Sequence, residues 1–392
     1  MKETSFLAKL LDGERVEWKS LGEVCDFKNG FAFKSNLFRE KGLPIIRITN
    51  VDGKTINLSD VKYFNPLDYK ENIKLYEVIY GDILVAMSGA TTGKIGFYDH
   101  PTTAYLNQRV GKFLPKKILN NRYLYHYLLS QVESIYVVAG GGVQPNLSSN
   151  VLMDKIQIPI PCPENPKKSL EIQAEIVRIL DNFTTLTAEL TAELTARKKQ
   201  YAYYRDQLLA FAEGEVEWKP LGEVYKFQYG MGNTIPTLGG EYPVYGSNGI
   251  VGTHNKFNSE DSPVIGHIGA YAGIVNWGAG KHFVTYNGVI CKLINQLVHP
   301  KYAYYQLLKQ DFNSMAKSAS HPFVSYDALN KVSIPIPPPA EQARIVSILD
   351  KFDALTNSMT EGLPREIELR QQQYEYYRDL LLNFPKTEGV TK

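Results

Sequence analysis

Two short motifs carry residue types that could bind a nucleotide or methylate a base. The first, SGATTGKIG at residues 88–96, has the glycines and the lysine of a phosphate-binding loop. Only three residues separate Gly89 from Gly93, and isoleucine follows Lys94, whereas a P-loop needs four residues there and then a Ser or Thr for Mg²⁺. The β-branched residues on both sides predict a turn between two strands instead.

The second motif, FNPLDY at residues 64–69, resembles the Asn-Pro-Pro-aromatic loop of adenine methyltransferases. Leu67 stands where that loop has its second proline, and no glycine-rich cofactor loop follows a strand nearby. We interpret the motif as a surface loop.

Histidines and cysteines form no reactive set. None of the seven histidines stands at metal-ligand spacing or beside an obvious nucleophile. The three cysteines have no CxxC spacing, so we expect buried or idle thiols. They are Cys25, Cys162 and Cys291. The sequence therefore contains no catalytic constellation and no metal site that we can identify.

The elements that carry these residues occur twice. RVEWKSLGEVCDFKNG at residues 15–30 reappears as EVEWKPLGEVYKFQYG at 215–230, which pairs Trp18 with Trp218 and Gly30 with Gly230. Each copy continues through glycine-punctuated strands, a short amphipathic helix and a Pro-rich strap. The strands lie at 81–99 and 262–278, the helices at 121–131 and 300–310, and the straps at 155–166 and 331–339.

Each copy ends in a long helix. QAEIVRILDNF at residue 173 and QARIVSILDKF at residue 342 open the two helices, and QYAYYRDQLLAF and QYEYYRDLLLNF close them. Apolar residues of the first helix follow four- and three-residue steps, which predicts a seam that packs on the second helix. Gly362 and Pro364 predict a break in the second helix. The seam residues are Ile176, Leu180, Phe183, Leu190, Leu194, Tyr201, Tyr204, Leu208 and Phe211.

The predicted fold is α+β. Two similar mixed α/β domains are joined by two long helices that pack as an antiparallel coiled coil, in a pseudo-two-fold tandem repeat. The first domain spans residues 1–166 and the second 213–339. The helices span 167–212 and 340–384, with the break near 361–364, and a tail follows at 385–392.

This layout, with its IPIP straps, ILDxF helix starts, YRDxLL helix ends and TAELTAEL repeat, resembles the specificity subunits of type I restriction-modification systems. The resemblance is closest to the group with TAEL repeats. It implies a non-catalytic subunit in which each domain reads one half of a bipartite, asymmetric sequence in double-stranded DNA. It also implies partners: two modification subunits that methylate adenine with S-adenosylmethionine, and two restriction subunits that use ATP and Mg.

The expected DNA contacts are polar side chains on glycine-rich loops, which suit base edges and phosphates. In the first domain they are Lys34, Arg47, Ser88, Thr91, Lys94, Gln108 and Arg109. In the second they are Asn233, Ser247, Asn248, His267, Tyr271 and Asn287. We also expect Tyr203 and Leu209 to lie on the outer face of the helix.

Two TAEL units, residues 187–194, serve in this interpretation as a length adjuster, because each unit lengthens a helix by ~6 Å. Half-site centres one helical turn apart predict an unread gap of about 6–7 bp. A two-headed peptide- or glycan-binding module on a coiled-coil spacer remains the alternative. Net charge, at +2, favours neither. No signal peptide or membrane-spanning run is evident, so we expect a cytoplasmic protein.

Overall fold

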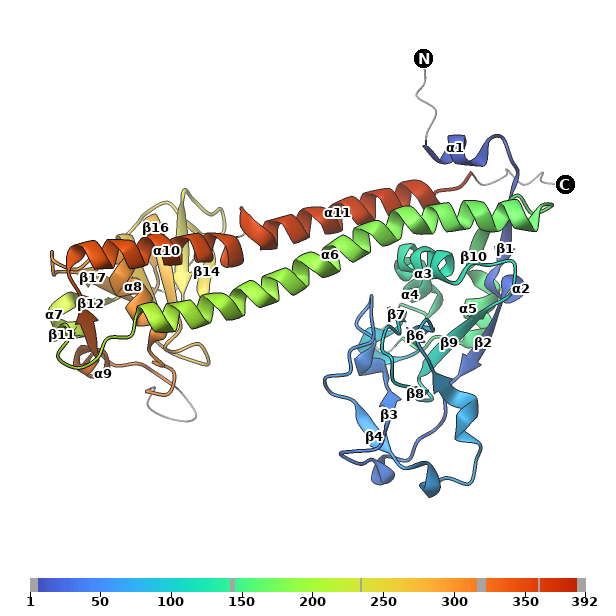
Figure 1. Cartoon of the computed structure of the whole chain (residues 1–392), viewed down its shortest axis with the longest axis horizontal. Coiled ribbons are helices and arrows are strands. Elements are labelled where there is room, and N and C mark those ends of the chain that lie inside the picture. The colour runs from blue at the N-terminus through green and yellow to red at the C-terminus, as the bar shows by residue number, and fades with distance from the viewer. Residues whose placement is uncertain (1–5, 142–144, 233–234, 316–321, 359, 386–392) are drawn as a thin grey trace, which may run out of the picture. The chain divides into compact units, whose positions relative to one another are not determined.

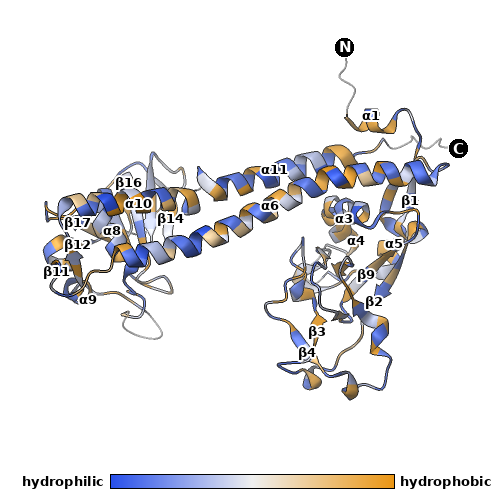
Figure 2. Cartoon of the chain, in the orientation of Figure 1, coloured by the Kyte–Doolittle hydropathy of each residue, from blue (hydrophilic) through white to orange (hydrophobic). Residues whose placement is uncertain are grey.

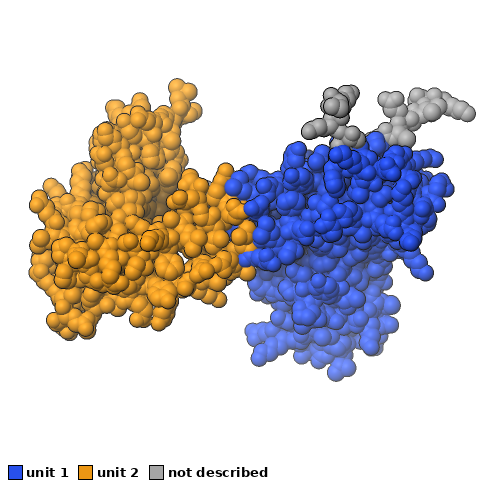
Figure 3. Space-filling model, turned by 45° about the horizontal axis from the view of Figure 1, so that its top comes forward, with its two compact units in different colours: residues 1–189, 367–392 blue, residues 190–366 orange. Residues whose placement is uncertain are grey.

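The computed structural model describes residues 6–141, 145–232, 235–315, 322–358 and 360–385, and its ribbon is drawn in Figure 1. The chain divides into two compact units. Unit 1 comprises residues 1–189 and 367–392, and unit 2 comprises residues 190–366 (Figure 3). Unit 1 is therefore assembled from two separate stretches of chain, whereas unit 2 is continuous.

Unit 1 contains two four-stranded sheets, in the orders β2-β9-β6-β7 and β4-β3-β8-β5. The predicted strands flanking the SGATTGKIG motif are β6 and β7, and they pair antiparallel across a short 3-10 turn, Gly89–Thr91. The P-loop look-alike is thus a turn between strands. The strands are β2 (Cys25–Asn29), β3 (Leu43–Ile46), β4 (Lys62–Phe64), β5 (Glu77–Val78), β6 (Ile83–Ala86), β7 (Ile95–Phe97), β8 (Ala104–Leu106) and β9 (Val110–Pro115).

Unit 2 contains one six-stranded sheet in the order β12-β17-β15-β16-β13-β14. Its long strand β16 pairs antiparallel with β15 and parallel with β13. In unit 1 two separate strands make the corresponding pairs: β7 pairs antiparallel with β6, and β8 pairs parallel with β3. Pro101 lies between β7 and β8 and cannot donate to a strand ladder, which accounts for the interruption. The strands are β12 (Tyr225–Tyr229), β13 (Tyr242–Gly246), β14 (Gly249–His254), β15 (Ser259–Gly266), β16 (Val275–Val284) and β17 (Gly288–Leu293).

Both Pro-rich straps form small sheets with the repeated EWK segments. In unit 1, β10 (Gln157–Pro161) pairs antiparallel with β1 (Val16–Ser20). In unit 2, β18 (Ser333–Ile336) pairs antiparallel with β11 (Glu217–Pro220). Each sheet has only two strands, so the prolines that cannot donate lie at an edge, where they are tolerated.

Short helices cover the sheets. The predicted amphipathic helices are α3 (Asn121–Ser130) and α8 (Pro300–Lys309), and their buried tyrosines enter the two main cores. Cys25, Cys162 and Cys291 are free and buried, as expected for idle thiols. The remaining short helices are α1 (Phe6–Leu11), α2 (Leu21–Val24), α4 (Val132–Val138), α5 (Ser149–Lys155), α7 (Leu221–Val224) and α9 (Tyr326–Lys331).

The central helix α6 (Pro166–Leu208) is one uninterrupted element. Within unit 1 its first half runs antiparallel to α11 (Gly362–Leu382), where the Phe183 and Tyr377 rings stack at 5.2 Å (Figure 1). Within unit 2 its second half runs antiparallel to α10 (Pro339–Asn357), where Tyr201 stacks on Phe352 at 6.0 Å. Polar and apolar residues alternate along all three helices in Figure 2, as a packed seam requires.

Three of the nine predicted seam residues are fully buried. Ile176, Leu180 and Tyr201 are buried, whereas Tyr204 is 42% exposed and no described residue from 181 to 200 is fully buried. The expectation that Leu209 faces outward is wrong, because it lies in the unit 2 core at 1% exposure. Its N–H still donates to the Arg205 carbonyl at 3.0 Å, and its carbonyl accepts from Gln306 and Lys309 of α8, so the end of α6 packs on that helix. Tyr203 is exposed at 62%.

The second long helix is interrupted between α10 and α11. Helix α10 ends at Asn357, and α11 begins at Gly362, whose φ of +77° is a left-handed conformation that favours glycine. Pro364 then falls in the first turn of α11, where a missing N–H breaks no helical bond. No described helix is long and apolar enough to cross a membrane.

Candidate functional site

One tight turn anchors the candidate site of unit 1. Residues 107–110 link β8 to β9, and the Val110 N–H donates to the Asn107 carbonyl at 2.8 Å. The Gly30 N–H, just after β2, donates to the Val110 carbonyl at 3.2 Å. A Cβ on Gly30 would lie 2.0 Å from the Asn107 carbonyl oxygen, so only glycine permits this approach.

Unit 2 builds the same turn from residues 285–288. The Gly288 N–H donates to the Thr285 carbonyl at 2.9 Å, and the Gly230 N–H donates to the Gly288 carbonyl at 2.9 Å. A Cβ on Gly230 would lie 2.1 Å from the Thr285 carbonyl oxygen. The glycine repeated in the sequence therefore has one structural role in both units, which is to hold this turn against the preceding strand.

A third segment, at the end of β6 or β15, bonds to the third residue of each turn. The Met87 N–H donates to the Arg109 carbonyl at 2.8 Å in unit 1. The His267 N–H donates to the Asn287 carbonyl at 2.8 Å in unit 2. These backbone bonds align the two sites residue by residue.

A fourth segment enters ahead of helix α5 or α9. In unit 1 the Leu147 N–H donates to the Met87 carbonyl at 2.7 Å, and in unit 2 the Val324 N–H donates to the His267 carbonyl at 3.0 Å. We call these matched backbone bonds the shared frame. It brings together side chains that are far apart in the sequence.

In unit 1 the shared frame surrounds a cleft of 870 Å³. Gln108 and Arg109 are exposed there, and neither side chain makes a hydrogen bond or ion pair within the described residues. The Ser88 hydroxyl is buried and has no hydrogen-bond partner in the described structure. The exposed Gln108 and Arg109 side chains are therefore donors that are free for a ligand. Its lining residues are Asn29, Met87, Ser88, Gly89, Ala90, Gln108, Arg109, Pro145, Asn146, Leu147, Ser148 and Ser149.

The matching position in unit 2 is aromatic. Tyr229 stacks on Tyr326 at 4.2 Å and contacts the His267 ring at 4.3 Å, and Tyr286 lies 5.9 Å from Tyr229. Burial lowers the pKa of His267, so the neutral ring is favoured. Its Nδ1 lies 3.1 Å from the Val324 carbonyl, which can only accept, so Nδ1 carries the proton.

The shared frame gathers about half of the predicted contact residues. Ser88, Gln108 and Arg109 line the unit 1 cleft. In unit 2 the Ser247 hydroxyl donates to the carbonyls of Ile268 and Asn287 at 3.1 and 3.2 Å, next to His267.

The other predicted residues lie elsewhere. The Thr91 hydroxyl donates to the Ile48 carbonyl, and Arg47 lies 3.8 Å from Asp60, so both serve the neighbouring loops. The side chains of Lys34, Lys94, Asn248 and Tyr271 are not among those that line the unit 1 cleft or form the aromatic cluster of unit 2. Asn233 lies outside the described residues.

Sequence reasoning missed several residues at these positions. Asn29 and Tyr229 directly precede the repeated glycines, and that placement was a usable signal. Asn146 and Ser149 of unit 1, like Tyr326 of unit 2, enter through the fourth segment, which no local pattern connects to the turn.

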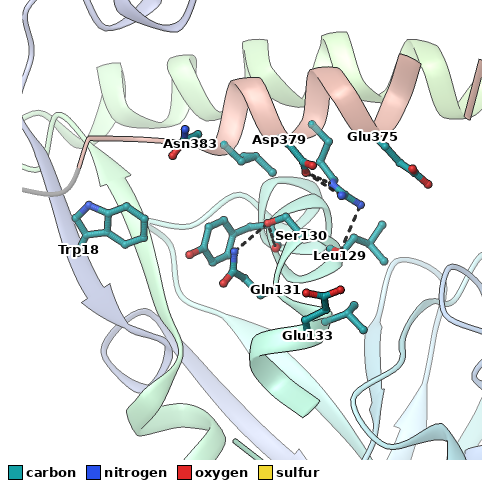
Figure 4. A pocket seen from close by; sticks show the side chains of 12 residues that line it. Trp18, Leu129, Ser130, Gln131, Glu133, Glu375, Asp379 and Asn383 are labelled. Atoms are coloured by element: carbon teal, nitrogen blue, oxygen red, sulfur yellow. Dashed lines mark hydrogen bonds and ion pairs between the residues drawn. The ribbon is translucent and has the colours of Figure 1, made fainter. Parts of the chain in front are cut away.

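A second hollow in unit 1 lies between α3, α4 and α11 and measures 770 Å³ (Figure 4). Trp18, Glu133 and Glu375 line it, and Arg378 pairs with Asp379 at 2.8 Å. Arg378 is the one cation among the lining residues, and its charge is paired with Asp379. Two further carboxylates, Glu133 and Glu375, line the wall of the hollow.

A partly buried polar cluster joins α3, α6 and α11 of unit 1. Asp181 accepts from Arg122 Nε at 3.1 Å and from His126 Nε2 at 2.7 Å, and Tyr374 donates to His126 Nδ1 at 2.9 Å. Burial lowers the pKa of His126 although the Asp181 hydrogen bond opposes it. Burial alone would raise the pKa of Asp181, but His126 and Arg122 outweigh it and hold that pKa below its usual value.

Unit 2 places Asp350 at the matching position. Tyr305 donates to Asp350, and burial together with this bond raises the pKa of Tyr305. Tyr201, which matches Tyr374, has a buried hydroxyl with no hydrogen-bond partner in the described structure. Lys301, which matches Arg122, lies over the Trp277 ring at 4.4 Å instead of reaching the aspartate.

Two copies of one frame, which differ in the side chains they present, define a tandem recognition protein. Within the described ranges, no group of three or more His, Cys, Asp or Glu side chains is arranged to hold a metal ion. The family model for the type I restriction modification DNA specificity domain matches residues 14–197 and 213–369. The chain belongs to this family of non-catalytic specificity subunits.

Relatives span the whole chain. The Escherichia coli type I restriction enzyme EcoR124I/EcoR124II specificity subunit is 38% identical over 423 residues, covering 100% of both chains. The Escherichia coli EcoprrI specificity subunit is 36% identical and covers 92% of this chain and 93% of its own. The crystal structure of a type I system S subunit from M. genitalium has a TM-score of 0.63 at 18% identity and covers 96% of this chain and 98% of that one, a likeness of fold.

Proposed function

We propose that this chain directs a type I restriction-modification complex to a bipartite, asymmetric sequence in double-stranded DNA, with each unit reading one half. The observation that carries the proposal is the shared frame, which occurs twice with different side chains. A protein that read two identical half-sites would need no such difference.

The chemistry belongs to partner subunits. Modification subunits holding S-adenosylmethionine methylate N6 of adenine in each half-site, and restriction subunits use ATP and Mg to cleave DNA. The chain itself acts in the cytoplasm and holds no cofactor. The proposal is supported by family membership and by the donors that the unit 1 cleft leaves free.

The experiment is reconstitution with the modification subunits, followed by sequencing of modified bases in DNA exposed to the complex. A single bipartite motif with an adenine methylated in each half is the expected result. Methylation by this chain alone, or salt-independent DNA affinity of the assembled complex, would contradict the proposal.

Two copies of the modification subunit fit a repeated surface on the helices. Tyr203 and Tyr204 form an exposed edge-to-face pair at 5.5 Å in unit 2, and Tyr376 and Tyr377 form the same pair at 5.3 Å in unit 1. Exposed aromatic side chains are favoured at protein interfaces. A partner that binds one pair binds the other, which supports a stoichiometry of two.

Native mass spectrometry of the complex tests this stoichiometry. Tyr203→Ala or Tyr376→Ala should each leave one modification subunit bound, and the double variant should leave none. Tyr271→Ala, which removes a tyrosine that is 50% exposed on a loop of unit 2, is the matched control and should leave two. Full assembly by the double variant would place the docking surface elsewhere.

The spacer between the half-sites is set by α6. Both TAEL units lie inside this continuous helix, where Leu190 and Leu194 are only half-buried, so the stretch can change length without opening a core. We propose a gap of about 6–7 bp for the present length.

Inserting a third TAEL unit between Leu194 and Thr195 lengthens the helix by ~6 Å and rotates it about 40° past a full turn. The gap in the methylated motif should then be one base pair longer, because flexing of the DNA absorbs the rest of the added length; DNA that did not flex would give two base pairs. Both half-sites should be unchanged. A motif with the original gap would show that the repeat is neutral helix.

A further inference from the structure

The third residue of the turn in the shared frame is Arg109 in unit 1 and Asn287 in unit 2. Its backbone is fixed in the same way in both. The Arg109 N–H donates to Asn107 Oδ1 at 3.4 Å, and the Asn287 N–H donates to Thr285 Oγ1 at 3.3 Å. Because the carbonyl of each residue is also bonded, at 2.8 Å in both units, only the side chain is free to meet a ligand.

Both side chains are free of protein partners within the described residues. The Arg109 guanidinium is exposed and makes no ion pair there, whereas Arg39 pairs with Asp68 at 2.8 Å and Arg122 pairs with Asp181. The Asn287 amide likewise makes no hydrogen bond in the described structure. An arginine placed only for stability would be expected to take a carboxylate, as the other two do.

The exchange of arginine for asparagine identifies what the position reads. A contact that serves only to neutralise the phosphate backbone would keep a positive charge at both positions, and Asn287 has none, although asparagine can donate to a phosphate oxygen. A base edge is met by a pair of groups: arginine offers two N–H donors, and asparagine offers one donor and one acceptor. Arginine matches O6 and N7 of guanine, and asparagine matches N6 and N7 of adenine.

We propose that Arg109 and Asn287 occupy equivalent base-reading positions, at which unit 1 selects a guanine and unit 2 selects an adenine. The inference rests on the proposed function and assigns one base of each half-site to one residue. Gln108 in unit 1 and Tyr286 in unit 2 lie beside these residues on the same turns, so the neighbouring base is met by an amide in one half-site and by a ring in the other.

The test uses the reconstituted complex and sequencing of modified bases. Arg109→Gln should lose about ten- to a hundredfold of the preference for guanine at one position of one half-site. Arg109→Lys keeps the charge and can still donate to O6 and N7 of guanine, so it should keep the salt dependence of binding and part of the preference. Asn287→Ala should relax one adenine position in the other half-site only. Lys70→Gln, which removes an exposed charge of unit 1 outside the cleft, is the matched control and should keep the motif.

Each outcome decides the inference. An unchanged motif with Arg109→Gln, together with a weaker salt dependence of binding, would make Arg109 a phosphate contact and overturn it. If Arg109→Gln methylates too little to be sequenced, its binding to duplexes substituted at each base gives the same comparison, and equal loss at every position would also overturn it. A wild-type complex that methylates no bipartite motif would instead contradict the proposed function.

Discussion

Unit 1 and unit 2 place a matching, partly buried aspartate in different hydrogen-bond networks. Asp181 in unit 1 accepts from a cation and a histidine, and that histidine also binds the hydroxyl of Tyr374. Asp350 in unit 2 accepts from one tyrosine, while the matching Tyr201 hydroxyl is left without a partner in the described structure. A carboxylate on the inner face of the long helix is therefore compatible with two hydrogen-bond networks of different size.

The clefts differ in the same sense. Unit 1 uses amides, a hydroxyl and a guanidinium on the shared frame, and unit 2 uses stacked rings. The difference shows that the backbone bonds between the strand ends, rather than the side chains between them, make the two units alike. A substitution in one unit should therefore change that unit and leave the other unit as a reference.

The largest effect is expected at the aspartates. Asp181→Ala leaves the fully buried His126 without an acceptor and Arg122 without its carboxylate, which should cost about 2–3 kcal/mol of unit 1 stability. Asp350→Ala strands only the Tyr305 hydroxyl and should cost unit 2 about 1–2 kcal/mol. Hydrogen exchange resolved by unit measures both. Glu189→Ala, an exposed carboxylate on the same helix α6, should change neither unit.

Equal losses in the two units would mean that network size does not matter. Asp181→Asn sharpens the result, because the amide oxygen can still accept from His126. It should recover part of the loss.

The repeated glycines come next. Gly30→Ala forces the 107–110 turn away from the strand and should cost about 1–3 kcal/mol by overpacking. It should also reduce the base preference at the half-site read by unit 1 and leave the other half-site unchanged. Gly230→Ala should reduce the base preference at the half-site read by unit 2 only. Sequencing of modified bases reports both. Gly22→Ala is the control, because its Cβ would meet the Met153 carbonyl at an ordinary 3.4 Å. Simultaneous loss of both half-sites would refute separate reading by the two units.

A smaller effect is expected from acidification. Burial holds the pKa of His126 below its unfolded value, so between those two values the unfolded chain binds more protons than the folded chain. Its contribution to stability is complete above a pH of about 6.5 and is lost as the pH falls toward the folded pKa. Urea unfolding monitored in unit 1 should therefore weaken with acid in the wild type.

His126→Gln does not titrate and should show a flatter profile in unit 1. Unit 2 contains His267 and His282, whose pKa values burial also lowers. Because His126→Gln leaves both of these histidines in place, the pH profile of unit 2 stability should be the same in the two proteins. A profile that is identical in unit 1 of the two proteins would mean that His126 does not sense pH.

The smallest loss of stability is expected at the cations Lys301 and Arg122, which occupy matching positions in the two units. Lys301→Ala removes contacts with the Trp277 and Tyr304 rings and should cost about 0.5–1 kcal/mol. Arg122→Ala removes ring contacts with Phe97 and Tyr125 and also the bond to Asp181, so it should cost more. Thermal unfolding of the full chain measures the difference, and a larger loss from Lys301→Ala would reverse the assignment.

Local patterns predicted what depends on neighbours in the sequence. The straps were foreseen because alternating proline restricts the backbone of its own segment, and the helix interruption because Gly362 and Pro364 disfavour helix where they stand. The repeat itself exposed Gly30 and Gly230, although their shared role, a carbonyl 2.0 or 2.1 Å from the missing Cβ, needed coordinates.

What stayed out of reach depends on segments that meet across long stretches of chain. The partners of Asp181 come from residues 55 and 59 positions away, and Tyr374 is 248 positions from His126. Likewise, the cleft is lined from four separate segments, so the sequence indicated Ser88 and Arg109 from loop chemistry but not Asn146 or Ser149. Leu209 was misassigned because the residues that bind its carbonyl, Gln306 and Lys309, lie 97 and 100 positions away.

The discontinuity of unit 1 has a consequence for synthesis on the ribosome. Residues 190–366 are all synthesised before the last stretch of unit 1 begins, so the continuous unit 2 is complete in sequence before unit 1 is. Until Tyr374 and Leu381 are made, the nascent core of unit 1, which includes Ile176 and Leu180 of α6, lacks two of its buried members. The first-made part of unit 1 therefore completes its core only after unit 2 has been synthesised.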